Sequence, residues 1–145
     1  MNSELVTTKS IEINSSSEKV WDALTNPEKI KVYLFGTETI TDWKVGSSII
    51  FQGEYQGHKY KDKGTIKEIV HAKILQYDYW SGFSGLEDKP ENYSLITFHL
   101  EVKNDKTTLT LTQQGFASEQ AQQHSETSWA TVLKVIKELS EKVSN

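Results

Sequence analysis

The sequence predicts an α+β fold in which a curved antiparallel sheet of six or seven strands wraps around a long C-terminal helix. Residues 48–114 alternate mostly between apolar and polar side chains, and strand follows strand without a crossover helix. Residues 118–143 instead repeat apolar side chains at steps of three and four, as a buried helix face does. Two short helices are expected between the first strand and this sheet.

Composition favours a single globular domain over residues 1–145. The chain is 36% hydrophobic and 25% charged, and it contains 4 Trp, 6 Tyr and 5 Phe. The absence of cysteine excludes disulfides and thiolate chemistry. A net charge of −4 without a basic stripe argues against a nucleic-acid partner. No signal-peptide core and no run near the roughly 20 apolar residues of a membrane span are present, so we expect a cytoplasmic location.

Alternation and capping patterns predict the first elements. Residues 6–14 alternate as a strand does. Ser15 and Glu18 have the spacing of a capping box, in which a hydroxyl and a carboxylate satisfy free N–H groups at a helix start. Asn26 and Pro27 begin a second short helix, because proline loses no hydrogen bond at the first helical position. The expected apolar faces of the two helices are Val20, Trp21 and Leu24, and Ile30, Tyr33 and Leu34.

The rest of the sheet is expected to form a meander. A weak strand at residues 37–41 and a turn at residues 42–46 lead into it. The following strands are expected from Ile49 to Tyr55, over 60–70, over 73–80 and over 93–103, and from Leu109 to Gln113, with a long loop at 81–92. The residues expected to point inward are Ile49, Phe51, Gly53, Tyr55, Leu75, Tyr77, Tyr79, Ile96, Phe98, Leu100, Val102, Leu109, Leu111 and Gln113.

The C-terminal helix is apolar at its end and polar at its beginning. The inner stripe contains Trp129, Val132, Leu133, Ile136, Leu139 and Val143. Extended towards its start, the same stripe meets Ala121, Ser125 and Ser128, with His124 at its edge. A helix that only closed a core would be apolar along its whole stripe. The pattern therefore predicts a cavity under the first two turns, and it indicates binding rather than catalysis.

Several short motifs occur together in a family-like order. They span residues 20–28, 35–38, 42–47, 62–64, 90–93, 109–113 and 124–129. Together these motifs resemble the START-like (SRPBCC) superfamily, and specifically the activator of Hsp90 ATPase homologue 1-like (AHSA1) family. The resemblance covers nearly the whole chain and implies a helix-grip fold, in which the sheet clasps the long helix around a hydrophobic pocket. Related domains bind lipids, polyketides and plant hormones, cyclise or hydrolyse substrates, or contact chaperones.

Our first hypothesis is a binding module for a small hydrophobic, lipid-like or aromatic ligand. The candidate ligand-binding residues are Trp21, Phe51, Tyr55, Tyr77, Tyr79, Phe98, Gln113, His124, Ser128 and Trp129. Aromatic residues at such positions also fill cores, so the tyrosines and Gln113 are the more informative ones. A buried phenol or amide needs a hydrogen-bond partner, which a wet or ligand-filled space can provide.

The second hypothesis is a cyclase- or hydrolase-type enzyme that uses the same cavity. His124 is its candidate acid or base, whereas His99 alternates onto the face opposite Phe98. A surface or capping role is the competing interpretation of His124. The four histidines lack the spacing of a metal site, and no phosphate loop or dinucleotide fingerprint is present, so no metal or cofactor is expected. Catalysis is therefore the weaker hypothesis.

The third hypothesis is a protein-interaction module, for a chaperone or for a second copy of the chain. Trp43 and the loop residues Trp80, Phe83 and Leu86 are its candidates, and the same loop could serve as a lid or pack on its own domain. True Hsp90 activators have a separate N-terminal domain that this sequence lacks, so the resemblance does not transfer chaperone stimulation. We expect a monomer or a weak dimer.

Overall fold

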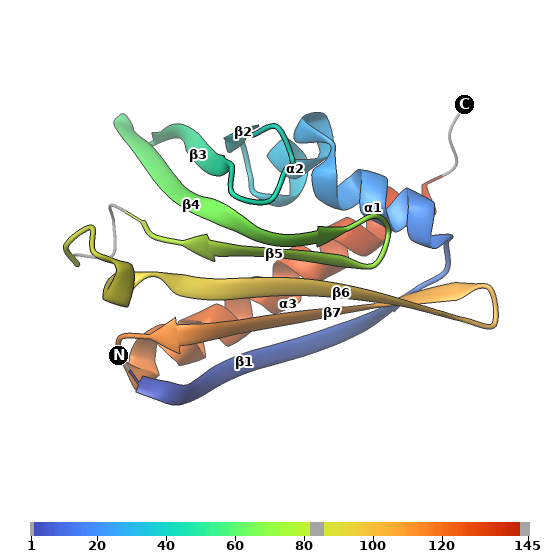
Figure 1. Ribbon diagram of the computed structural model, residues 1–145. Helices are drawn as coiled ribbons and strands as arrows, with labels where there is room; N and C mark the ends of the chain where they lie inside the picture. Colours follow the sequence, from blue (N-terminus) through green and yellow to red (C-terminus); the bar gives the residue numbers. More distant parts are fainter. Residues whose placement is uncertain (1, 82–85, 143–145) are drawn as a thin grey trace.

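The computed structural model describes residues 2–81 and 86–142, and the side chains of residues 2–4 and 55 lie outside the described part. The described strands form one seven-stranded antiparallel sheet in the order β1-β7-β6-β5-β4-β3-β2 (Figure 1). The strands are β1 (Asn2–Ile13), β2 (Glu38–Ile40), β3 (Ser48–Tyr55), β4 (His58–Val70), β5 (Ile74–Tyr79), β6 (Ser94–Lys103) and β7 (Lys106–Phe116). The helices are α1 (Ser17–Thr25), α2 (Pro27–Tyr33) and α3 (Glu119–Glu141), with a short 3-10 helix, η2 (Pro90–Asn92). The α+β prediction is confirmed.

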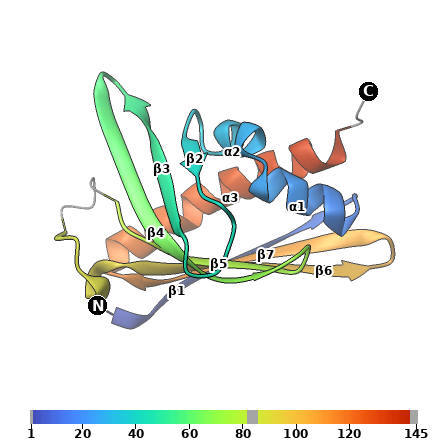
Figure 2. The ribbon, with the colours of Figure 1, turned by 45° about the horizontal axis from the view of Figure 1, so that its top comes forward.

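The long helix α3 lies on one face of the sheet and runs alongside β1 (Figure 1). Near its start, the Thr7 hydroxyl of β1 donates a hydrogen bond to the carbonyl of Gln122 at 3.3 Å. Near its end, the Ser15 hydroxyl donates to the carbonyl of Ser140 at 2.9 Å. The two short helices α1 and α2 contact α3, and Figure 2 shows them beside its C-terminal half. One end of the layer between helix and sheet is therefore closed by additional helices.

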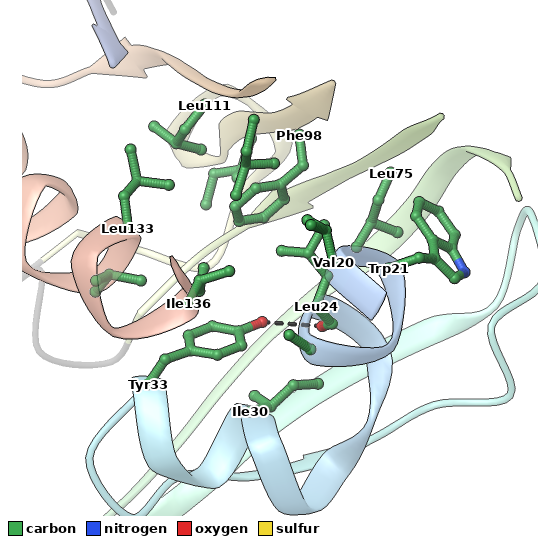
Figure 3. Packing of buried hydrophobic residues seen from close by; sticks show 14 of the residues in the cluster. Val20, Trp21, Leu24, Ile30, Tyr33, Leu75, Phe98, Leu111, Leu133 and Ile136 are labelled. Carbon is green, nitrogen blue, oxygen red and sulfur yellow. Dashed lines mark hydrogen bonds between the residues drawn. The ribbon is translucent and has the colours of Figure 1, made fainter. Parts of the chain in front are cut away.

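The apolar core fills this closed end. Leu24 of α1 and Ile30 of α2 pack towards Leu133 and Ile136 of α3, and all four side chains are buried (Figure 3). The Tyr33 hydroxyl lies inside the same cluster and donates to the carbonyl of Leu24 at 2.9 Å (Figure 3). A buried phenol is costly without such a partner, so this bond fixes α2 against α1.

The first helix begins one residue later than the capping pattern predicts. Ser16, and not Ser15, caps α1, and its hydroxyl oxygen accepts from the backbone N–H of Lys19 at 3.2 Å. The Ser15 hydroxyl instead donates a hydrogen bond to the carbonyl of Ser140. This carbonyl is one of the last in α3, where carbonyl groups have no partner within the helix. Glu18 does not complete a capping box, because its carboxylate pairs with the His71 imidazole at 2.8 Å.

Most of the predicted alternation in the sheet is observed, and one inward position is wrong. Ile96, Phe98 and Leu100 of β6 are buried, but Val102 of the same strand is 60% exposed. Val102 lies near the tip of the β6–β7 hairpin, which extends past the helices in Figure 1. Alternation places a side chain on a face, but burial also requires a neighbour above that face.

Among the described helices, none combines the length and apolar character needed to cross a lipid bilayer.

Strands β4 and β5 approach each other very closely at Gly64. A Cβ atom placed on Gly64 would overlap the backbone carbonyl oxygen of Asp78. The Asp78 carboxylate reinforces the contact, because its Oδ1 accepts from the backbone N–H of Thr65 at 2.7 Å. Gly53 of β3 is crowded differently, since a Cβ there would lie 2.6 Å from the hydroxyl of the Tyr60 side chain. The first obstacle is backbone and the second is the end of a side chain.

We therefore expect Gly64→Ala to lower the free energy of unfolding by about 2 kcal/mol or more, because strands must separate to admit the methyl group. Gly53→Ala is the matched control and should cost less, since the Tyr60 ring can move. Chemical denaturation of both variants measures the difference. Equal losses, or a Gly64→Ala variant as stable as the wild type, would contradict the close approach.

Candidate functional site

A cavity of about 810 Å³ lies between the N-terminal half of α3 and the inner face of the sheet. Its helix wall includes Ala121, His124, Ser125, Ser128, Trp129 and Val132, and its sheet wall includes Phe51, Asp62, Tyr77, Tyr79, Ser94, Ile96 and Gln113. The position agrees with the polar stripe at the start of the helix. Small side chains in the first half of α3 leave this space open. The large apolar side chains in the second half of α3 instead pack into the core.

The structure brings together seven of the ten predicted site residues. Phe51, Tyr77, Tyr79, Gln113, His124, Ser128 and Trp129 line the cavity. Phe98 is 1% exposed and packs behind the Trp129 ring, and it is not among the lining residues. Trp21 lies at a separate hollow of about 430 Å³, together with Trp43 and His71. The side chain of Tyr55 lies outside the described residues.

Aromatic rings form a continuous chain from β5 to α3. Phe51 contacts both Tyr79 and Tyr77, with centroid separations of 5.8 and 5.5 Å. Tyr77 is followed by Phe98 at 6.4 Å, and Phe98 meets Trp129 edge-on at 5.6 Å. Such offset and edge contacts are favourable for aromatic pairs. Four of the five rings, those of Phe51, Tyr77, Tyr79 and Trp129, line the cavity and form its aromatic wall.

Gln113 joins the helix to the sheet at the cavity wall. Its amide oxygen accepts hydrogen bonds from the Trp129 indole N–H at 2.7 Å and from the Ser125 hydroxyl at 2.9 Å. Its amide nitrogen donates to the Ser94 hydroxyl oxygen on β6 at 3.0 Å. The expectation that this amide requires partners is met by protein groups from two other elements. Trp129 is thereby held in one orientation at the edge of the cavity.

Asp62 is a lining residue that the sequence analysis missed. The Tyr79 hydroxyl donates to its Oδ2 at 2.5 Å. The residue is only 7% exposed, and its Oδ1 is buried without a hydrogen-bond partner in the described part of the chain. The available signal was the two-residue step from Ile66 through Gly64, which places Asp62 on the inner face of β4. Asp62 was not predicted as a site residue, because a carboxylate in a strand is usually exposed to solvent.

The cavity tyrosines are hydrogen-bond donors and remain protonated. Burial raises the pKa of Tyr77 and Tyr79 well above the usual range. For Tyr79, the negative charge and the hydrogen bond of Asp62 raise the pKa further. His124 lines the cavity from an exposed position on α3. Within the described part of the chain, no three histidine or carboxylate side chains gather into a group that could hold a metal ion.

The loop before β6 forms another wall of the cavity. Trp80 and Leu86 both line it, and the Trp80 indole N–H donates to the carbonyl of Leu86 at 3.2 Å. The Trp80 ring stacks on Tyr93, and Asp88 accepts a hydrogen bond from the Tyr93 hydroxyl. Phe83, the third apolar residue predicted in this loop, lies outside the described residues. The described residues of the loop thus pack on their own domain.

A family model described as activator of Hsp90 ATPase homolog 1-like protein matches residues 14–141. The chain belongs to this family. The resemblance inferred from the short motifs is therefore confirmed. No curated protein matches the chain. Family membership and the fold agree on a sheet that clasps a long C-terminal helix.

Solved structures share the fold over nearly the whole chain. The solution structure of ChR145 from Cytophaga hutchinsonii is 43% identical, covers 95% of this chain and 94% of its own, and has a TM-score of 0.82. The Aha1 dimer from Colwellia psychrerythraea is 21% identical, with coverage of 94% and 96% and a TM-score of 0.72. CalU16 from Micromonospora echinospora is 21% identical, with coverage of 93% and 75% and a TM-score of 0.71. The last two show likeness of fold.

The raised pKa values predict delayed ionisation of the buried phenols. In the unfolded chain a tyrosine loses its proton at about pH 10, whereas burial keeps Tyr33, Tyr77 and Tyr79 neutral at that pH in the folded protein. Their contribution to stability is complete below that pH and is lost as the pH rises above it. Phenolate absorbance in an alkaline titration should show these three ionising only with unfolding. Reversible ionisation of every tyrosine near its ordinary pKa would contradict their burial.

Replacing Gln113 tests the link between helix and sheet. Gln113→Leu leaves the Trp129 indole N–H and the Ser125 hydroxyl without their acceptor, so we expect a loss of about 2 kcal/mol in the free energy of unfolding. Gln114→Leu, at the exposed neighbouring position on β7, is the matched control. Denaturation curves give both values. A loss no larger than that of the control would show that the amide does not hold α3.

Proposed function

We propose that the cavity binds a small, largely apolar molecule with aromatic character. The observation that carries this proposal is the aromatic chain along a cavity that small residues of α3 leave open. Ala121, Ser125 and Ser128 occupy positions where a helix that only closed a core would carry large apolar side chains. These small residues keep the cavity open, and the helix buries less apolar surface against the sheet as a result.

The dimensions and the lining of the cavity support a small-molecule ligand. Sites for such ligands commonly enclose about 300–1,000 Å³ and combine apolar walls with a few placed polar groups. The apolar contribution comes from Phe51, Ile96, Trp129 and Val132, and the polar contribution from side chains such as Ser128. Flat aromatic rings suit the edges and faces that this wall presents.

An exposed apolar residue at the cavity supports the proposal that a ligand can enter from solvent. Phe35, in the turn after α2, lines the cavity and is 68% exposed. Its backbone has a φ of 53°, an unfavourable conformation for a residue with a bulky side chain. A large apolar side chain held at the surface beside a cavity can contact an incoming ligand. Trp80 and Leu86 supply further apolar surface to the same cavity.

The contacts of the loop favour ligand binding over the protein-interaction hypothesis. Trp80 uses its indole N–H and one ring face within its own domain. The hypothesis of an enzyme is less well supported, because its candidate acid or base, His124, lies at an exposed position on α3. A binding module requires no such group, and the polar side chains of the cavity can orient a ligand.

Filling the cavity from the helix side tests this function. Ser128→Trp places an indole in the space, so we expect the affinity for the fluorescent probe anilinonaphthalene sulfonate to fall by about tenfold or more. Ala130→Trp is the matched control, because Ala130 is exposed on the same helix but is not among the lining residues. Fluorescence titration measures both affinities, and circular dichroism confirms folding. Equal affinities of the two variants would place the bound probe outside the cavity.

A further inference from the structure

The described residues satisfy only one oxygen of the Asp62 carboxylate. Oδ2 accepts the hydrogen bond of the Tyr79 hydroxyl, which has only one proton to donate. Oδ1 is buried and has no hydrogen-bond partner within residues 2–81 and 86–142. Buried polar atoms are nearly always hydrogen-bonded, and an exception calls for an explanation. Here the exception belongs to a carboxylate, for which the cost of missing partners is greatest.

The neighbouring lysines do not compensate the charge. Lys61 and Lys63 flank Asp62 on β4, so alternation directs them to the opposite face, and both are exposed. Lys63 pairs with Asp88 at 2.5 Å and lies 5.9 Å from the centre of the Trp80 ring. Across the described residues, no ion pair reaches Asp62. Asp62 thus lines the cavity with an Oδ1 that has no hydrogen-bond partner among the described residues.

The surroundings of Asp62 define what could approach it. Phe51 is its direct partner across the β3–β4 pair and lines the same cavity. The Phe51 ring also contacts Tyr79, which fixes the orientation of the carboxylate. An aromatic ligand lying against Phe51 would bring a substituent on its edge towards Asp62. That substituent requires a proton to donate, because a carboxylate only accepts hydrogen bonds.

The geometry points to a recognition subsite at Asp62 and Tyr79 that selects aromatic molecules carrying a hydrogen-bond donor, such as a phenolic hydroxyl. This inference rests on the proposed binding function and specifies the class of ligand. A molecule of the same shape without a donor leaves the buried Oδ1 unpaired, so it lacks the hydrogen bond that a donor-bearing molecule gains there. Charge-assisted hydrogen bonds are also stronger than neutral ones. Selectivity is thus a direct consequence of the free oxygen.

A matched pair of probes isolates this interaction. 2-Naphthol and 2-fluoronaphthalene have nearly the same size, but only the first can donate a hydrogen bond. Their affinities are measured by displacement of anilinonaphthalene sulfonate from the wild-type chain. We expect 2-naphthol to bind about tenfold more tightly or better. Amide NMR spectra with each probe check that both occupy the cavity, through shifts at Gln113 and Trp129.

Three variants assign the preference to Asp62. Asp62→Leu removes the acceptor while keeping a branched side chain, and the preference should fall to within about twofold. Asp62→Asn retains a neutral acceptor and should lower the preference by a smaller factor. Glu68→Gln is the control, because this carboxylate is exposed on the same strand and is not among the cavity residues. It should preserve the wild-type preference.

The outcomes separate this inference from the binding function itself. If both probes bind the wild type equally well, or the preference survives in Asp62→Leu, the subsite is refuted and cavity binding stands. If neither probe displaces the dye nor shifts the cavity amides, both proposals fail. Circular dichroism establishes that each variant is folded, and Asp62→Asn provides the answer if Asp62→Leu does not fold.

Discussion

The hydrogen bonds of the Gln113 side chain determine where the core ends and the cavity begins. This amide lies on the inner face of β7 and joins Ser94 of β6 to Ser125 and Trp129 of α3. On one side of it, Leu133 and the following turns of α3 pack into a closed apolar core. On the other side, small residues of the same helix leave the sheet uncovered. A buried amide is costly to leave unpaired, so the helix has one favourable position.

The closed end of the molecule keeps the open end from collapsing. A single helix covers only part of a seven-stranded sheet, and α1 and α2 supply the missing layer at one end. The Asn14 backbone N–H donates to the Glu141 carboxylate, and the Lys137 ammonium donates to the Glu12 carbonyl, so the last turns of α3 are tied to β1. Because these contacts set the distance of the helix from the sheet, the first turns cannot approach the aromatic wall to fill the space. A preformed cavity follows from the rigidity of the distant core.

Sequence periodicity predicted the architecture because periodicity reports local geometry. The two-residue alternation identified the strands, and the three- and four-residue steps identified α3 together with the change of character along it. The misplaced helix start at Ser15 has a non-local cause, since the Ser140 carbonyl that attracts this hydroxyl lies at the other end of the chain. Val102 is a similar case, because its exposure depends on how far the helices reach over the hairpin.

The candidate site was predictable to the extent that it consists of inward-facing aromatic residues. Phe51 and Phe98 show the same alternation pattern, yet one lines the cavity and the other is buried behind Trp129. What distinguishes them is which part of α3 lies above each strand position, and no local pattern contains that information. Asp62 was missed for the opposite reason, because the alternation was visible but carboxylates are rarely buried. Exceptions to such rules are expected at functional sites.

The polar groups of the cavity differ in their access to water, and this difference orients a ligand. Ser128 and His124 are exposed on α3, so water can satisfy them when the cavity is empty. Ser125 is buried but already donates to Gln113. Among these groups, Asp62 Oδ1 is the one that is buried and lacks a hydrogen-bond partner from the residues that the structure describes. The free energy gained when a ligand donor reaches a polar group is largest where no water has to be displaced. A ligand with one polar end therefore gains most by directing that end towards Asp62 and leaving its apolar body along the aromatic wall.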